Sequence, residues 1–244
     1  MRALITNDDG IDSPGLLALA LAARDHGFEV VVAAPARQSS GSSASITAAE
    51  EDGRIHIDRR TLAGLDGVDA FAVRGAPGLI ALIASNGAFG EKPDLVLSGI
   101  NHGANVGRAI LHSGTVGAAL TGGMGGALGL AISLDAGFDP KALEWDAAAR
   151  VARAVLPTLL AQAPGTVLNL NVPNVAVPAE VREASLAPFG IVQTTMHRDG
   201  EHHVRLAVED LPNDPVAGSD AALLAEGYAT LTSITPVSAV PLSR

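Results

Sequence analysis

The sequence contains no cysteine, and aromatic and charged residues are scarce. The absence of cysteine excludes disulfide bonds and thiolate chemistry. Aromatic residues make up 3% of the chain, so alanine, valine, leucine and isoleucine have to fill the core. No apolar run resembles a membrane span of roughly 20 residues, and the start, MRALITNDDG, is too short in its apolar part for a signal peptide. We therefore expect a soluble, cytoplasmic protein without a membrane partner.

Basic residues are also fewer than acidic ones. Lysine and arginine number 16 against 26 acidic residues, which gives a formal net charge of −10. Binding to a nucleic-acid polymer needs a cationic surface, so we expect no such partner. A small phosphorylated substrate is not excluded, because one bound metal ion can reverse the sign of the local field.

The chain is rich in apolar residues, at 48% of 244 positions, which is ample for a large core. Continuous apolar strands that alternate with helices are typical of a parallel sheet covered on both faces. Residues 1–175 are therefore predicted to form an α/β core. Strands are expected at 3–6, 29–34, 55–58, 70–73, 94–97, 130–134 and 167–172, and helices at 16–26, 78–85, 114–128 and 145–160.

The pattern changes after Pro173. Strand-like runs at 191–197 and 203–208, the second of them alternating, flank Asp199-Gly200, a pair typical of a hairpin turn. The remaining elements expected here are a strand-like run at 181–186, a helix at 219–227 and a strand at 228–234. Because a two-stranded ribbon is marginally stable alone, we expect residues 176–244 to form an extension that packs on another subunit, within one structural unit.

Polar side chains follow three of the predicted strands: Asp8 and Asp9 in ITNDDGIDSPG, Ser40 in the loop 37–45, and Asn101 in SGIN. The carboxyl ends of parallel strands lie along one edge of a sheet, so these side chains could converge. Two carboxylates, a hydroxyl and an amide are hard oxygen ligands, which suit Mg²⁺, Mn²⁺ or Ca²⁺ better than Zn²⁺. A cation would also offset the repulsion between the two adjacent carboxylates.

A purely structural interpretation stays open for the same residues. Asp8 could cap the helix that begins near Pro14, and Asp9-Gly10 could be an ordinary turn. Ser113-Gly114-Thr115 precedes a predicted helix and could hold a phosphate, although Ser/Thr caps are common. The sequence has no EF-hand, dinucleotide, Walker, zinc or G-x-S-x-G pattern.

Taken together, these motifs resemble the SurE (survival protein E) family of 5′/3′-nucleotidases. The resemblance spans nearly the whole chain, and the ordered combination is specific although each motif alone is not. It is carried by Asn7-Asp8-Asp9-Gly10, Pro14-Gly15, Ala34-Pro35, Ser40-Gly41, Ser45, Ser98-Gly99-Ile100-Asn101, Gly103, Asn105, Gly107, Ser113-Gly114-Thr115-Val116, Ala118-Ala119, Asn169, Asn171-Val172-Pro173, Ser219-Asp220 and Gly227-Tyr228.

The resemblance implies a metal-dependent phosphatase that hydrolyses nucleoside 5′-monophosphates, with 3′-monophosphates as further candidates. It implies a Rossmann-like fold whose C-terminal part is exchanged between subunits of a homodimer or homotetramer. One divalent cation, Mg²⁺ or Mn²⁺, is expected on Asp8, Asp9, Ser40 and Asn101. Asp8 and Asp9 are also the candidate catalytic residues. The candidate substrate-binding residues are Asn7, Asn105, Ser113, Gly114 and Thr115.

The chain departs from the family pattern at three places. His112 stands where tyrosine is common, Thr121 where glutamate is common, and GAPGLIA at 75–81 where GTPADCV is common. The ligand set is intact, so we expect the activity to be retained, while the preferred nucleotide stays open. Two alternatives are a non-catalytic regulator that binds nucleotide or metal and, more distantly, a nucleoside hydrolase with a calcium site.

Overall fold

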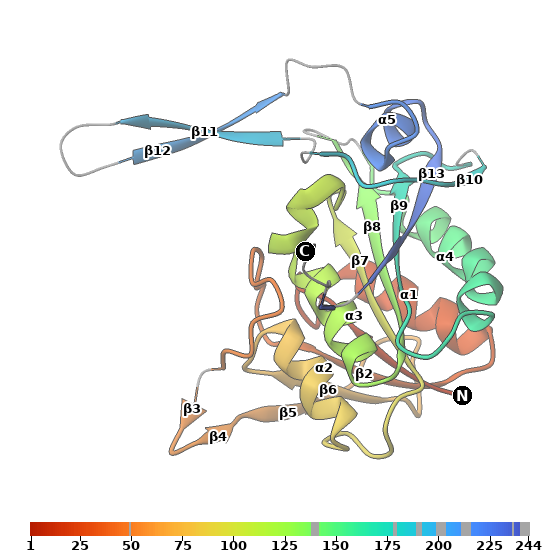
Figure 1. Ribbon diagram of the computed structural model, residues 1–244. Helices are drawn as coiled ribbons and strands as arrows, with labels where there is room; N and C mark the ends of the chain where they lie inside the picture. Colours follow the sequence, from red (N-terminus) through yellow and green to blue (C-terminus); the bar gives the residue numbers. More distant parts are fainter. Residues whose placement is uncertain are drawn as a thin grey trace.

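A nine-stranded, mostly parallel sheet forms the centre of the molecule, with the strand order β10-β13-β9-β8-β7-β1-β2-β6-β5 (Figure 1). The computed structural model describes residues 1–48, 50–137, 142–177, 180–188, 192–198, 204–210, 216–235 and 237–239. The strands of the sheet are β1 (Arg2–Thr6), β2 (Glu29–Pro35), β5 (Ile57–Arg60), β6 (Asp69–Val73), β7 (Leu95–His102), β8 (Leu128–Asp135), β9 (Val167–Pro173), β10 (Val181–Glu183) and β13 (Ala229–Ile234).

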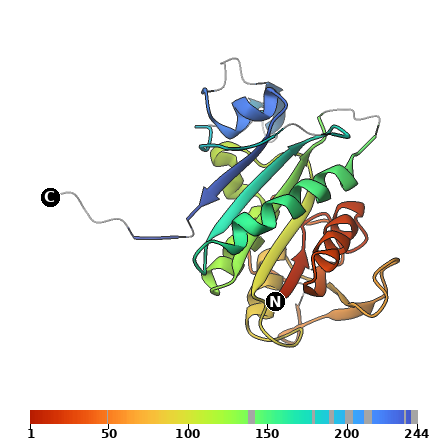
Figure 2. The same ribbon diagram turned by 90° about the vertical axis from the view of Figure 1, so that its right-hand side faces the viewer.

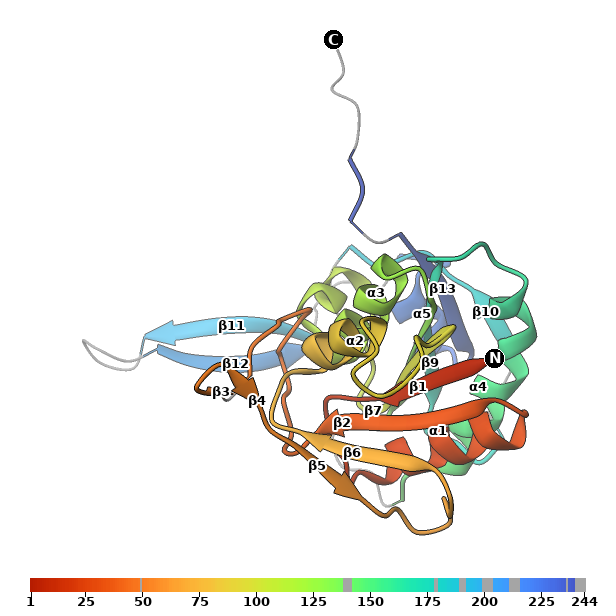
Figure 3. The same ribbon diagram turned by 90° about the horizontal axis from the view of Figure 1, so that it is seen from below.

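Helices cover both faces of this sheet, as the apolar strands require. The helices are α1 (Pro14–Asp25), α2 (Pro77–Ser85), α3 (Gly114–Met124), α4 (Trp145–Leu160) and α5 (Asp220–Ala225), with the 3₁₀ helix η1 (Gly107–His112) before α3. Helices α1 and α4 pack against each other over one face (Figure 2). Helices α2 and α3 pack together on the opposite face (Figure 3). The predicted α/β class with a mostly parallel sheet is confirmed.

Local sequence explains how the first strand–helix unit forms. Strand β1 is apolar and buried along Ala3–Thr6, so it suits the middle of the sheet. Ser13 caps α1 by accepting a hydrogen bond from the N–H of Leu16 at 3.3 Å, and Pro14 occupies the first helical turn. Gly27, with φ +98°, lets the chain turn into β2. The carboxyl end of β1 is thereby fixed where Asn7–Asp9 begin.

Some predicted boundaries were wrong. The helix expected at 114–128 ends at Met124, because Gly126 takes φ +90° and the chain enters β8 at Leu128. The strand expected at 55–58 is divided between β4 (Arg54–Ile55), which pairs with β3 (Glu50–Glu51), and β5. The run at 181–186 forms only the short β10. These are short polar or glycine-rich segments, in which tertiary contacts outweigh local propensity.

The sheet continues past residue 175. Strand β13 pairs antiparallel with β9, β10 pairs parallel with β13, and α5 packs on β13. The predicted hairpin strands are β11 (Val192–Arg198) and β12 (Val204–Asp210), which pair antiparallel as a separate ribbon that projects from the body (Figure 1). The predicted Asp199-Gly200 turn lies outside the described residues. No helix in the described part of the chain is long and apolar enough to cross a membrane.

Candidate active site

Side chains from several strand ends meet in a cavity of about 250 Å³ at the carboxyl edge of the sheet. Its lining residues come from the segments after β1 and β2, from the end of β7 and from η1 with the start of α3. They are Asp8, Asp9, Gln38, Ser40, Gly41, Asn101, His102, Asn105, Ala109, His112 and Ser113. The four predicted metal ligands and two of the predicted substrate contacts therefore line one space.

Asn7 builds the loop that presents the two aspartates. Its amide nitrogen donates to the Gly10 carbonyl at 3.1 Å and to Ser13 Oγ at 2.7 Å, while Oδ1 accepts from the Gly10 N–H at 3.1 Å. Gly10 takes φ +105°, which this tight turn requires. Asn7 is fully buried and does not line the cavity. We therefore assign Asn7 a positioning role in place of the expected phosphate contact.

The carboxylates of Asp8 and Asp9 are each fixed by a neighbouring donor. Thr115 Oγ1 donates to Asp8 Oδ1 at 2.5 Å, and the backbone N–H of His102 donates to Asp9 Oδ2 at 3.1 Å. Burial raises the pKa of Asp8, and the adjacent charge of Asp9 raises it further against the opposing effect of Thr115. Burial likewise raises the pKa of Asp9, against the hydrogen bond from His102. A nearby cation would relieve both effects.

In the Ser113-Gly114-Thr115 segment, one residue lines the cavity and the other two contact Asp8. Ser113 lines the cavity and caps α3, because its Oγ accepts from the Val116 N–H at 3.1 Å. Thr115 is fully buried, and its hydroxyl is committed to Asp8. A Cβ on Gly114 would lie 2.9 Å from Asp8 Oδ2. Gly114 and Thr115 thus shape the position of Asp8 and do not line the cavity.

The other two candidate ligands offer neutral oxygens. Asn101 Nδ2 donates to the Gly103 carbonyl at 2.7 Å, which leaves Oδ1 to face a ligand. Ser40 Oγ accepts from Gln38 Nε2 at 3.0 Å and keeps a second lone pair. Among the described residues, no cluster of three or more His, Asp or Glu side chains could hold a metal. Two carboxylates with neutral oxygens fit Mg²⁺ or Mn²⁺, since Mg²⁺ keeps several of its waters.

The match to known proteins covers most of the chain. Residues 3–197 match the family model described as survival protein SurE. The chain belongs to the SurE family. It is 38% identical over 245 residues to "5′-nucleotidase SurE 1" of Burkholderia lata, covering 96% of this chain and 90% of that protein. It is 37% identical over 244 residues to "5′-nucleotidase SurE" of Rhodopirellula baltica, covering 96% and 92%.

The fold agrees with this membership of the SurE family. The solved structure titled "Crystal Structure of Sure Protein from Aquifex aeolicus" matches with a TM-score of 0.76 at 29% identity. The match covers 97% of this chain and 94% of that one. The resemblance stated from the motifs is therefore confirmed along the chain.

In this SurE family member, a buried polar network that was not predicted from the sequence supports Asn105. The Asn105 carbonyl accepts from Asn169 Nδ2 at 2.8 Å and Asn171 Nδ2 at 2.9 Å, and Asn171 Oδ1 accepts from the Asn105 N–H at 2.8 Å. Asn105 Nδ2 donates to Ser133 Oγ at 2.8 Å. Asn169, Asn171 and Ser133 are fully buried. The two asparagines in the apolar strand VLNLNV could have indicated this network, because buried amides need hydrogen-bond partners.

We expect Asp8→Asn to stabilise the metal-free protein at neutral pH. Because folding raises the pKa of Asp8, its ionisation costs stability as pH rises from its ordinary pKa of 3.8 through the higher pKa of the folded protein. The neutral amide avoids that cost and keeps an oxygen for Thr115. Thermal unfolding in EDTA at pH 7 and pH 4 should show a higher Tm for the variant at pH 7 and a smaller gain at pH 4.

Magnesium provides the control for this prediction. Added Mg²⁺ should raise the Tm of the native protein more than that of Asp8→Asn, because a ligand stabilises the state that binds it. An equal rise of Tm in both proteins, or a lower Tm for the variant in EDTA at pH 7, would contradict the explanation that ionised Asp8 destabilises the metal-free protein.

Proposed function

We propose that this chain is a divalent-metal-dependent 5′-nucleotidase that releases phosphate from nucleoside monophosphates. The observation that carries the proposal is the convergence of Asp8, Asp9, Ser40 and Asn101 on one cavity. The SurE relatives described above bear the name 5′-nucleotidase. We also propose a cytoplasmic location, which the lack of cysteine favours.

The four converging residues would hold Mg²⁺ or Mn²⁺ through two carboxylates, one hydroxyl and one amide oxygen. A cation held there polarises phosphoryl oxygens and lowers the pKa of bound water. The protein's own contribution is mainly preorganisation, since each ligand side chain has a fixed partner before substrate arrives. Monoester hydrolysis is extremely slow without a catalyst, so this electrostatic term has to be large.

The remaining groups act on the phosphate and on a proton. Asn105, fixed by its buried network, and Ser113 orient the phosphoryl oxygens from one wall of the cavity. The N-terminus of α3 adds partial positive charge beside Ser113. We assign Asp9 the acceptance of a proton from the attacking water, because it lines the cavity and its raised pKa brings it closer to that of a working base.

We further propose that the β11–β12 ribbon contributes to a homodimer or homotetramer. The ribbon forms a sheet of its own that is not paired with the main sheet (Figure 1). An isolated two-stranded ribbon is marginally stable in water, so contact with a second copy would supply the missing packing.

A phosphate-release assay tests the proposed activity. The protein should release inorganic phosphate and intact nucleoside from AMP and GMP, lose this activity in EDTA and regain it with Mg²⁺ or Mn²⁺. Ca²⁺ in a parallel series shows how strictly the site selects its cation. Activity that survives complete metal removal would refute metal dependence, binding without turnover would favour a regulator, and release of free base would favour a nucleoside hydrolase.

A further inference from the structure

A second and larger cavity, of about 770 Å³, adjoins the candidate active site. The two cavities share Gln38, and the chain between them continues with Ser39 in the larger cavity and Ser40 in the smaller. The Ser39 N–H donates to the Asp8 carbonyl at 2.7 Å, which ties this dividing segment to the catalytic loop. The two cavities are therefore close enough for one small molecule to extend from one into the other.

The walls of the larger cavity combine apolar surface with a few polar groups. It lies at the ends of β2 and β6 and is lined by Pro35, Ala36, Arg37, Gln38, Ser39, Thr47, Ala48, Asp58, Val73, Arg74, Gly75 and Ala76. Such a mixture, in a volume between about 300 and 1,000 Å³, is typical of small-molecule sites. The smaller cavity, at about 250 Å³, is of a size for a phosphate and its cation and leaves little space for a nucleoside.

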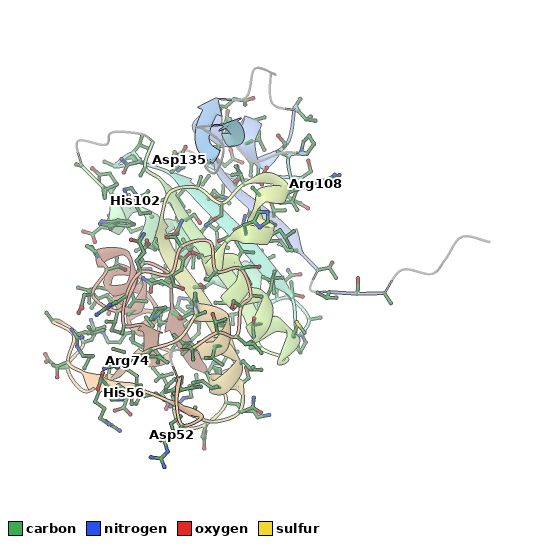
Figure 4. The ribbon with its side chains drawn as sticks, turned by 90° about the vertical axis from the view of Figure 1, so that its left-hand side faces the viewer. Asp52, His56, Arg74, His102, Arg108 and Asp135 are labelled. Atoms are coloured by element: carbon green, nitrogen blue, oxygen red, sulfur yellow. The ribbon has the colours of Figure 1, made fainter. Side chains whose placement is uncertain are left out.

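Two arginines give this cavity a positive wall in a chain of net charge −10. No carboxylate whose side chain the structure describes forms an ion pair with Arg37 or Arg74. The backbone N–H of Arg74 donates to the His56 carbonyl at 3.0 Å, which places these two residues side by side (Figure 4). Asp58 also lines this cavity; its Oδ1 pairs with His56 Nε2 at 2.9 Å, and its Oδ2 remains for another donor.

We propose that this cavity binds the base of the nucleotide substrate and selects guanine. The proposal rests on the nucleotidase function proposed above and names its preferred substrate. Guanine presents two acceptors, O6 and N7, on one edge, and arginine is their preferred bidentate partner. Its N1–H and amino group both donate hydrogen bonds, which a carboxylate such as that of Asp58 can accept. The apolar residues of the cavity cover the faces of the ring.

The other bases match this lining less well. Adenine carries an amino donor where guanine has O6, so an arginine meets a donor there, and its N1 has no proton for Asp58. Pyrimidines lack N7 and leave part of the cavity unfilled. Each bidentate pair of this kind discriminates by about 1–3 kcal/mol, which corresponds to roughly 5- to 150-fold.

Substrate competition with matched variants tests the guanine site. The native protein should show a kcat/KM for GMP at least about tenfold above that for AMP, with CMP lower still. Arg74→Ala and Arg37→Ala should each lower kcat/KM for GMP and reduce the GMP-to-AMP ratio. Asp58→Asn should reduce that ratio as well, because the amide nitrogen opposes the donors at N1 and N2. The variants' thermal unfolding is measured alongside to confirm that they fold.

Two controls separate base recognition from general damage. p-Nitrophenyl phosphate has no nucleobase, so its hydrolysis should be unchanged in all three variants. Arg60→Ala removes an arginine that pairs with Asp12 at 2.7 Å and lies outside this cavity, so it should leave the GMP-to-AMP ratio intact. Equal use of GMP and AMP by the native protein, or an equal loss of p-nitrophenyl phosphate hydrolysis in the variants, would overturn the proposal.

The outcome stays distinguishable from failure of the nucleotidase function. If the native protein hydrolyses no phosphomonoester with any metal, the proposed function fails while the cavity can still be examined. Calorimetric titration of guanosine and adenosine into the metal-free protein then reports on base binding alone. Tighter binding of guanosine, lost in Arg74→Ala, would support the site, and equal or absent binding of both would overturn it.

Discussion

Replacing Asp9 by asparagine is expected to lower kcat/KM for GMP by about 100- to 1,000-fold at saturating Mg²⁺, the range seen when one preorganised electrostatic group is removed. The amide keeps an oxygen that can accept from the His102 N–H, which Asp9 Oδ2 accepts at 3.1 Å. The variant therefore removes one charge while preserving the local hydrogen bond. Steady-state phosphate release over a series of Mg²⁺ concentrations measures the effect.

The matched control for this variant is Asp12→Asn. Asp12 lies three residues further along the same loop, is exposed, and pairs at the surface with Arg60. Because exposed ion pairs contribute little, at most about 1 kcal/mol, this variant should keep its activity. If Asp9→Asn retained full activity at saturating Mg²⁺, Asp9 would be removed from both the ligand set and the proton-transfer role.

The cavity at the sheet edge illustrates what can be predicted from a sequence of this kind. Strands β1, β2 and β7 are neighbours in a parallel sheet, so the residues at their carboxyl ends meet although 30 to 90 residues separate them in the chain. Apolar runs define such strands clearly, and the position of Asp8, Ser40 and Asn101 after these runs is enough to predict convergence, although β7 itself continues to His102. The structure brings these three together in one cavity.

The roles of Asn7, Thr115 and Gly114 could not be predicted in the same way. Each belongs to a predicted motif, but none of them lines the cavity. Asn7 holds the loop that carries Asp8, and Thr115 and Gly114 contact Asp8 itself. Whether a polar side chain faces a ligand or a neighbouring side chain depends on angstrom-scale packing, which a motif does not encode. Proximity in the sequence therefore locates the site, while tertiary contacts decide the role of each residue.

Glycines in α3 show the same limit. The helix predicted at 114–128 contains GTVGAALTGG, but its pattern does not indicate what the glycines approach. At Gly117 the neighbour is the backbone of Ser43 and Ala44, in the loop that carries Ser40. Two hydrogen bonds hold this loop on η1: the Ser43 N–H donates to the His112 carbonyl at 3.2 Å, and Ser43 Oγ donates to the Leu111 carbonyl at 2.6 Å. Contacts between a loop and a helix 70 residues away leave no periodic signal in the chain.

Gly117→Ala is accordingly expected to impair both stability and activity. A Cβ at this position would lie 2.2 Å from the Ser43 carbonyl oxygen and 2.6 Å from the Ala44 nitrogen, so the loop backbone has to move. Overpacking of this kind costs about 1–3 kcal/mol, which is measurable by chemical denaturation. Displacing the loop also displaces Ser40 from the cavity, and misplacement by about 1 Å can lower activity about 100-fold.

Gly75→Ala is the matched control for this last prediction. Its added methyl group would meet the movable end of the Leu79 side chain at 3.0 Å, and the backbone there needs no left-handed φ. With p-nitrophenyl phosphate, which has no base to enter the larger cavity, Gly75→Ala should retain activity that Gly117→Ala loses. Gly117 is buried and lines neither cavity. Normal activity in Gly117→Ala would therefore show that the position of Ser40 does not depend on the close approach of this loop to α3.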